Sequence, residues 1–333
     1  MKDYKDLNIL VVGAGTMGST IAQVMAAAGI KTTMADLEQR FLDGAKARIA
    51  TQIEGLVENG LADESYGKNV DENLDTILNA DIPGVAEKFD LVFEVVPENK
   101  DIKHSTYKML NDSCRPDCIF CSNTSGMPVF DVTADIMPDQ SRFLVTHWFN
   151  PPHMMKLVEV VYGPKTSDEV GQYVKGLLEF AGKKPAVLKH YCPGFIVNRI
   201  ATVINREFYY MIQQGWITGE DAENAMKYTN GIRWGFEGPT SLWDFVGLDI
   251  TVAVARDVLP TLCNDAETVK YGEELLAKGE LGMKADKGIF DWSDIDKDEW
   301  AKMRNRRILQ MTKVVDQWTK EDEESGMILK AAK

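Results

Sequence analysis

The sequence predicts an α/β doubly wound domain over residues 1–190, followed by an all-α domain over residues 191–333. The first observation is that short runs rich in β-branched residues alternate with helical patterns, as expected for a sheet covered by helices on both faces. The second is that this strand signal ends after Cys192-Pro193-Gly194. Beyond that point, apolar residues recur at helical spacing between glycine and proline breaks, which indicates a purely helical domain.

The predicted strands of the first domain lie at residues 7–12, 31–35, 89–96, 117–122, 142–148, 156–161 and 185–189. Helical stretches separate most of them, so consecutive strands can run parallel with crossover helices between them. Near the C-terminus, Ile308, Met311, Val315 and Trp318 recur at helical spacing. This spacing predicts an amphipathic terminal helix rather than an unstructured tail.

Composition excludes several classes of function. The 333 residues include 37 basic and 51 acidic side chains, a net charge of -14, which argues against a nucleic-acid-binding surface. No apolar run approaches the roughly 20 residues that a membrane helix needs, and the N-terminus lacks a signal-peptide layout. The five cysteines are an odd number, which is typical of proteins whose thiols stay reduced. We therefore expect a cytoplasmic protein with no membrane partner.

Three of the cysteines imitate a metal site. Cys114-x3-Cys118-x2-Cys121 matches the spacing that binds an iron-sulfur cluster in radical enzymes. In a strand over residues 117–122, however, Cys118 and Cys121 would point to opposite faces of the sheet. Because three thiolates could not then converge on one cluster, we expect no metal.

The segment after the first predicted strand contains three glycines at G-x-G-x-x-G spacing, namely Gly13, Gly15 and Gly18. The motif, which also includes Thr16 and Met17, follows a strand and leads into a helical stretch at residues 19–28, which is the context that gives it meaning. Gly13 permits the turn, Gly15 lets the backbone approach a pyrophosphate, and Gly18 allows close packing of helix on strand. The sequence therefore predicts a dinucleotide site, although a glycine turn that only packs is the alternative.

An acidic residue near this loop indicates which dinucleotide it binds. Asp36 ends the second predicted strand, where its carboxylate can bind the adenosine ribose hydroxyls and repel a 2′-phosphate. The sequence thus favours NAD as the cofactor, and the nearby Arg40 leaves NADP open.

A glutamate interrupts the apolar run at residues 157–161. Alternation along a strand puts Leu157, Glu159 and Val161 on one face. An unpaired carboxylate on a buried face would be costly, so Glu159 needs a partner, and His147 is one candidate. The alternative is an edge strand with Glu159 in water.

Polar groups also follow several predicted strands. Glu94 and Glu98 end one strand, Ser122 begins Ser-Asn-Thr-Ser at the end of the next, and His147 lies near the end of a third. Because an open sheet binds ligands at the carboxyl ends of its strands, these groups predict a site at one edge.

Six motifs then identify a family resemblance. GAGTMG, EVVPENKDIK, SNTS, THWFNPPHMMKLVEVV, PGFIVNRI and GPTSLWDFVGLD occur in the order and close to the spacing of the NAD-dependent L-3-hydroxyacyl-CoA dehydrogenases. The chain resembles this family up to about residue 292. The resemblance implies a Rossmann-like domain, a helical domain that forms a homodimer interface, and an active site in the cleft between the domains.

The resemblance also implies roles for single residues. His147 would be the general acid/base and Glu159 its orienting partner, while Ser122 and Asn198 would bind the reacting oxygens. On the cofactor side it implies Asp36 at the ribose and a set around the nicotinamide half, namely Glu98, Lys103, Ser122 and Asn150. Lys284 matches a lysine near the family's C-terminal motif and is also expected to bind the cofactor. A histidine with a reference pKa near 6.5 suits proton transfer at neutral pH. His153, six residues after His147, is the rival base.

The substrate remains open at this level. Family membership implies oxidation of a 3-hydroxyacyl-CoA to the 3-oxoacyl form. The stretch before Gly238-Pro239 departs from that pattern, because Arg233-Trp234 resembles relatives that oxidise CoA-free hydroxy acids such as gulonate or carnitine. A guanidinium could hold a free carboxylate with two hydrogen bonds, or it could form a surface ion pair with Glu237. A further alternative is a non-catalytic NAD-binding or structural protein.

Overall fold

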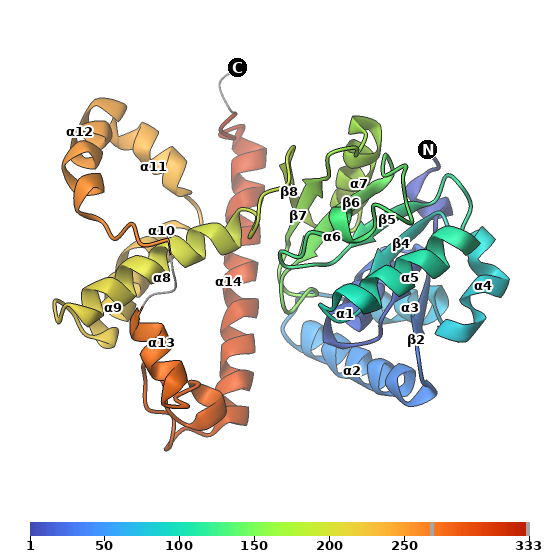
Figure 1. Cartoon of the computed structure of the whole chain (residues 1–333), viewed down its shortest axis with the longest axis horizontal. Coiled ribbons are helices and arrows are strands. Elements are labelled where there is room, and N and C mark those ends of the chain that lie inside the picture. Colours follow the sequence, from blue (N-terminus) through green and yellow to red (C-terminus); the bar gives the residue numbers. More distant parts are fainter. Residues whose placement is uncertain (267–269, 331–333) are drawn as a thin grey trace. The chain divides into compact units, whose positions relative to one another are not determined.

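The computed structural model describes residues 1–266 and 270–330. The chain forms two compact units, Met1–Val197 and Asn198–Lys333 (Figure 1). Below they are called unit 1 and unit 2. Among the described residues, no helix is both long enough and apolar enough to cross a membrane.

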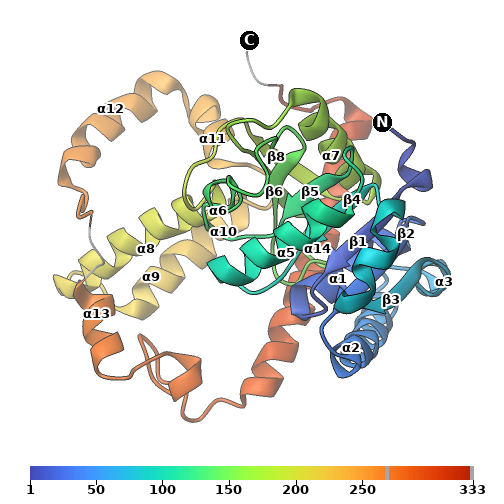
Figure 2. The ribbon, with the colours of Figure 1, turned by 45° about the vertical axis from the view of Figure 1, so that its right-hand side comes forward.

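Unit 1 is built on one sheet, part of which is seen in Figure 2. Its strand order is β3-β2-β1-β4-β5-β6-β7-β8. Its strands are β1 Asn8–Val12, β2 Lys31–Asp36, β3 Leu74–Leu78, β4 Leu91–Glu94, β5 Ile119–Ser122, β6 Phe143–Trp148, β7 Leu157–Tyr162 and β8 Lys184–Leu188. Strands β1 to β6 pair in parallel, β7 runs antiparallel to β6, and β8 runs parallel to β7. The order reverses beside β1, which is where such sheets bind dinucleotides.

Helices cover both faces of this sheet. One buried cluster contains residues of α1 Thr16–Ala27, α2 Gln39–Glu58, α3 Glu64–Asn73 and α7 Asp168–Phe180. The other contains residues of α4 Ile82–Val85, α5 Lys100–Ser113 and α6 Val129–Val132. Successive strand residues alternate between the two clusters, so the parallel strands are buried on both sides.

Unit 2 is helical in its described residues. Its helices are α8 Val197–Gln213, which starts at the last residue of unit 1, α9 Gly219–Ala225, α10 Gly231–Arg233, α11 Pro239–Val246, α12 Leu248–Val258, α13 Lys270–Ala277 and α14 Lys297–Ser325. The last of these confirms the predicted terminal helix, in which Trp318 packs edge-on against Phe236 at 5.6 Å between ring centroids.

The predicted fold class is confirmed, with two differences of detail. Strand β3 was missed because its residues are only half buried, which weakens the apolar pattern. The strand predicted at residues 89–96 is shorter, since β4 spans only Leu91–Glu94. Cys118 and Cys121 pack in different clusters, so their thiols lie on opposite faces of the sheet as expected.

Candidate active site

The glycine loop has the geometry that its sequence predicts. Gly13 has φ of 108°, and a Cβ there would lie 2.6 Å from the carbonyl oxygen of Val95. A Cβ on Gly18 would lie 1.8 Å from the carbonyl oxygen of Gly13, so α1 can approach β1 this closely only without a side chain. Around Gly15 a Cβ would meet nothing within 4 Å. The loop therefore leaves open space in front of the first turn of α1, which suits a pyrophosphate.

Asp36 stands at the end of β2 beside this loop. Its Oδ2 accepts a hydrogen bond from the amide of Ala14 at 2.6 Å, and its Oδ1 accepts one from Leu37 at 2.7 Å. The carboxylate is therefore held next to the glycine turn, where an adenosine ribose would lie. Arg40 pairs with Glu38 at 2.9 Å on the exposed surface. Glu38 thus engages the guanidinium of Arg40, the cation whose presence in the sequence had left NADP open as the cofactor.

His147 and Glu159 face each other across β6 and β7. They are partners in the antiparallel register, and His147 Nδ1 lies 2.7 Å from Glu159 Oε2. Glu159 is 0% exposed and β7 is flanked by β6 and β8, so the alternative of an edge-strand glutamate in water is excluded. The ring of His147 packs between Phe149 at 4.6 Å and Phe195 at 5.3 Å.

Glu159 also holds the start of α8. Its Oε1 accepts hydrogen bonds from the amides of Ile196 at 2.8 Å and Val197 at 2.9 Å. Burial would raise the pKa of Glu159, but the hydrogen bonds from His147 and the two amides outweigh it and hold the pKa below its usual range. The carboxylate therefore stays ionised beside the imidazole.

Phe195, just before those amides, has a left-handed backbone with φ of 51° although its ring is buried. A bulky residue in that conformation is strained, and strain of this kind gathers at functional sites. Here it places one ring against His147 and the next two amides against Glu159.

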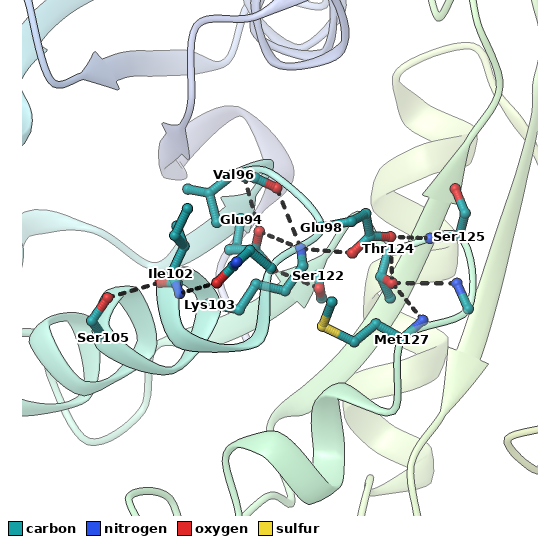
Figure 3. Close-up of polar contacts among 12 residues, drawn as sticks. Glu94, Val96, Glu98, Ile102, Lys103, Ser105, Ser122, Thr124, Ser125 and Met127 are labelled. Atoms are coloured by element: carbon teal, nitrogen blue, oxygen red, sulfur yellow. Dashed lines mark hydrogen bonds and ion pairs between the residues drawn. The ribbon is translucent and has the colours of Figure 1, made fainter.

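A second buried network joins the ends of β4 and β5 (Figure 3). Lys103 Nζ lies 2.7 Å from Glu94 Oε1, and both side chains are fully buried. Ser122 donates its hydroxyl proton to Glu94 Oε2 at 2.7 Å, and the amide of Val96 donates to Oε1 at 2.9 Å. Because Ser122 has one proton and gives it to Glu94, only its lone pairs remain for any other partner.

Glu98 forms the exposed side of the same network. It lies 3.5 Å from Lys103 Nζ, and its Oε1 accepts hydrogen bonds from Thr124 Oγ1 and the amide of Ser125, both at 2.7 Å. The carboxylate thus joins the loop after β4 to the loop after β5, the two loops expected around a nicotinamide (Figure 3).

Sequence reasoning counted Glu94 among the polar groups at the strand ends but gave it no role in the site. It is the residue that binds both Lys103 and Ser122. Lys103 and Ser122, expected beside the cofactor, are fully buried in this network. The signal for Glu94 was a carboxylate at the end of an apolar strand, which is related to the carboxylate inside an apolar strand that drew attention to Glu159.

The other expected residues lie in two places. Asn150 is in the loop after β6 in unit 1, and Asn198 follows Val197 in the first turn of α8. Arg233 ends α10 and Lys284 lies in the 3₁₀ turn Met283–Ala285, both within unit 2.

The rival base His153 has a buried ring. Burial first, and then the charge of Lys183, lower its pKa to about 4, so the ring is neutral near pH 7. Neither ring nitrogen has a hydrogen-bond partner within the described structure. His147, with its ionised partner, is therefore the better placed of the two for proton transfer.

Comparison with known proteins matches both units. Residues 8–191 match the 3-hydroxyacyl-CoA dehydrogenase NAD binding domain and residues 194–292 match the C-terminal domain of the same family. A probable 3-hydroxybutyryl-CoA dehydrogenase of Bacillus subtilis is 33% identical over 291 residues, covering 86% of this chain and 97% of that protein.

The name of a second relative refers to a pyridine carboxylate and not to a CoA thioester. The 5-formyl-3-hydroxy-2-methylpyridine 4-carboxylate 5-dehydrogenase of Mesorhizobium japonicum is 28% identical over 309 residues, covering 93% of this chain and 98% of that protein. A crystal structure of the enzyme so named, described as an NAD+ dependent dismutase, superposes with a TM-score of 0.84 at 28% identity and the same coverage. Because the matched domains span most of the sequence and the glycine loop fits the cofactor, the chain belongs to the 3-hydroxyacyl-CoA dehydrogenase family and is an NAD-dependent oxidoreductase.

Proposed function

We propose that this protein catalyses the reversible oxidation of the 3-hydroxyl of a 3-hydroxyacyl compound to the 3-oxo form, with His147 as the general acid/base. The observation that carries the proposal is the 2.7 Å contact between His147 Nδ1 and the ionised Glu159. β6 runs parallel to β5, β4 and β1. His147, near the carboxyl end of β6, therefore lies on the same side of the sheet as the glycine loop, which follows the carboxyl end of β1.

The roles follow from hydrogen-bond chemistry. Glu159 is an acceptor, so Nδ1 of His147 keeps its proton and donates a hydrogen bond to the carboxylate, which leaves Nε2 to receive the proton of the substrate hydroxyl. The carboxylate then stabilises the imidazolium that forms. NAD, when bound, supplies the hydride acceptor. In the reverse direction the imidazolium gives its proton to the carbonyl oxygen of the 3-oxo compound, which becomes the hydroxyl.

We further propose that the substrate carries a free carboxylate. The likeness to the CoA-free pyridine dehydrogenase extends over 93% of the chain, against 86% for the 3-hydroxybutyryl-CoA relative. Arg233 is exposed, and among the described residues it forms no ion pair with Glu237, whose backbone amide instead donates to the Arg233 carbonyl at 2.7 Å. The guanidinium is thus available to hold a carboxylate with two hydrogen bonds.

A CoA thioester is the second candidate, favoured by the 33% identity to the 3-hydroxybutyryl-CoA relative. An NADH-coupled assay decides between them by comparing 3-hydroxybutyryl-CoA with a panel of free 3-hydroxy acids and the pyridine carboxylate. We expect turnover of free acids. Turnover of the CoA thioester alone would assign the second candidate, and NADH binding without turnover of any compound would leave a non-catalytic protein.

Arg233→Ala tests the carboxylate contact directly. We expect kcat/KM for free acids to fall about tenfold to hundredfold, because a bidentate hold on the substrate is lost. Arg256→Ala, at another exposed arginine of unit 2, is the matched control. An equal effect of both variants would remove Arg233 from the substrate site.

The assembly is proposed to be a homodimer formed through unit 2. Helices α11 and α12 expose Trp243, Phe245, Ile250 and Val254, by 46%, 83%, 54% and 56%. A patch of this kind on two consecutive helices is typical of an interface between protein surfaces.

A further inference from the structure

Unit 1 contains a buried cation without a counter-ion. Lys183 lies between α7 and β8 and is 6% exposed. Its Nζ donates to the carbonyl oxygens of Pro152 at 2.6 Å and Met155 at 3.2 Å, and it lies 5.4 Å from the ring centroid of Trp148. Within residues 1–266 and 270–330, no carboxylate pairs with this group.

Such a group destabilises a fold unless its contacts compensate. Burial first, and then repulsion from Lys156, lower the pKa of Lys183 to about 7. The neighbouring ring of His153 is neutral at that pH and adds no further positive charge. Two carbonyl contacts and one aromatic ring offset only part of the desolvation cost of an ammonium group. We therefore look for a role of Lys183 beyond packing.

Both carbonyls belong to the loop between β6 and β7. Pro151 and Pro152 have no amide hydrogen, so this loop has few hydrogen bonds of its own. The amides of Met154 and Met155 both donate to the Pro151 oxygen, at 3.0 and 2.9 Å, which closes one turn. The oxygens of Pro152 and Met155 are then the ones that Lys183 binds, so its ammonium group ties the turn to the start of β8.

The same loop carries groups of the proposed site. It begins at Phe149, whose ring lies 4.6 Å from that of His147, and continues with Asn150, expected beside the nicotinamide. A shift of the turn would therefore move a ring that packs on His147 and a side chain that is expected to face the cofactor.

We propose that Lys183 is a positioning residue, which fixes the loop after β6 and thereby the placement of Phe149 and Asn150 against the nicotinamide half of the cofactor. This inference rests on the proposed function in one respect, namely that the loop after β6 faces the nicotinamide half of the cofactor. Lys183 itself touches neither His147 nor Asn150. It acts through the two carbonyls that it binds.

Comparing the binding of two ligands distinguishes a positioning role of Lys183 from general destabilisation of the fold. ADP-ribose lacks the nicotinamide and is expected to bind through the glycine loop and Asp36, whereas NADH is expected also to contact the loop after β6. In Lys183→Met we expect the Kd of NADH to rise about tenfold, because removing an outer partner that orients a binding group typically costs that much. The Kd of ADP-ribose should change less than about twofold, since the glycine loop is intact. Lys184→Met, which removes the exposed neighbouring lysine, should leave both values unchanged.

The amides of the loop give a second readout. Hydrogen exchange at Met154 and Met155 should accelerate in Lys183→Met and stay unchanged in the glycine loop. If Lys183→Met does not fold, Lys183→Gln, which keeps N–H donors on a neutral and shorter side chain, takes its place in both measurements. Equal changes in the two Kd values, or unchanged exchange in the loop, overturn the proposal. Because neither measurement uses a substrate, a failure of the proposed reaction would show separately, in the coupled assay.

Discussion

The two units of this protein bury their apolar residues in opposite ways. Unit 1 has one apolar cluster on each face of its sheet. In the described part of unit 2, the buried hydrophobic residues are only Ala222, Cys263 and Leu309. Large side chains such as Phe245 and Tyr228 are instead 83% and 73% exposed. Unit 1 therefore completes its own core, whereas unit 2 presents apolar surface to something else.

This difference separates the functions of the units. The groups that must keep a fixed geometry, the glycine loop and the pair of His147 and Glu159, lie on the packed sheet of unit 1. A rigid scaffold holds such groups to a fraction of an ångström. Arg233, the residue expected to determine substrate specificity, lies in unit 2. We therefore expect substitutions in unit 1 to change the chemistry, and substitutions in unit 2 to change specificity and assembly.

The largest expected effect is that of His147→Gln. Glutamine cannot exchange a proton at neutral pH, so kcat should fall by about 10⁴, the upper end for loss of a general base. NADH affinity, measured by fluorescence titration, should stay within about twofold because the glycine loop is untouched. His104→Gln, at a histidine that pairs with Asp135 on the surface, is the control and should keep full activity. Substantial residual turnover in His147→Gln would remove His147 from its assigned role.

Glu159→Gln should have the next largest effect, about 10²- to 10³-fold in kcat. The glutamine oxygen can still accept from Ile196 and Val197, but its amide would donate to Nδ1 of His147. The wrong tautomer then presents N–H at Nε2, where a base is needed. Stopped-flow measurement of hydride transfer checks this, with circular dichroism to confirm folding. Loss of NADH affinity together with kcat would instead mean that Glu159 only holds the fold.

The sequence predicted the fold of unit 1 well because parallel strands buried on both faces are nearly continuous apolar runs. Strand β1, with four of five residues buried, was located within a residue. Strand β3 was missed because only one neighbour covers it and its residues Leu74–Leu78 alternate weakly. A strand at the sheet edge depends on pairing with β2, and pairing is not a local property of a sequence.

For the site, local chemistry predicted single residues and left their partners open. Glu159 stood out because a carboxylate inside an apolar strand needs a partner. That the partner is His147 follows from the antiparallel register of β6 and β7, which the two segments alone do not fix. Glu94 was underrated for the same reason, since Lys103 and Ser122 reach it from α5 and β5.

Phe245→Asp tests whether the exposed apolar surface of unit 2 forms an interface, which would explain its difference from unit 1. If α11 lies in a homodimer interface, a charge there should weaken dimerisation about thirtyfold or more, as expected for an aromatic residue at the centre of an interface. Phe41→Asp, at an exposed phenylalanine of unit 1, is the matched control and should leave the dimer intact. Sedimentation velocity over a dilution series measures both. A wild-type chain that is monomeric at all concentrations would contradict the proposed assembly.

The smallest expected effect concerns the stability of unit 1 in acid. Asp90 accepts hydrogen bonds from Lys2 at 3.0 Å, the amide of Asn8 at 2.9 Å and Arg115 at 2.7 Å. Burial would raise the pKa of Asp90, but these three donors outweigh it and lower the pKa. A carboxylate whose pKa is lower in the folded than in the unfolded state stabilises the fold above the unfolded value, near 3.9, and loses that contribution as pH falls through the folded value.

Asp90→Asn should therefore lower the free energy of unfolding by about 1–2 kcal/mol at pH 7, a modest figure because Lys2 and Arg115 are partly exposed and screened by water. The difference from the wild type should shrink as pH falls below about 4 and disappear below the lowered pKa of the folded state, where both chains carry a neutral side chain at this position. Urea titrations at pH 7 and pH 3.5, followed by hydrogen exchange in β1 and β4, measure it. A difference that stays constant with pH would show that the two cations contribute nothing through charge.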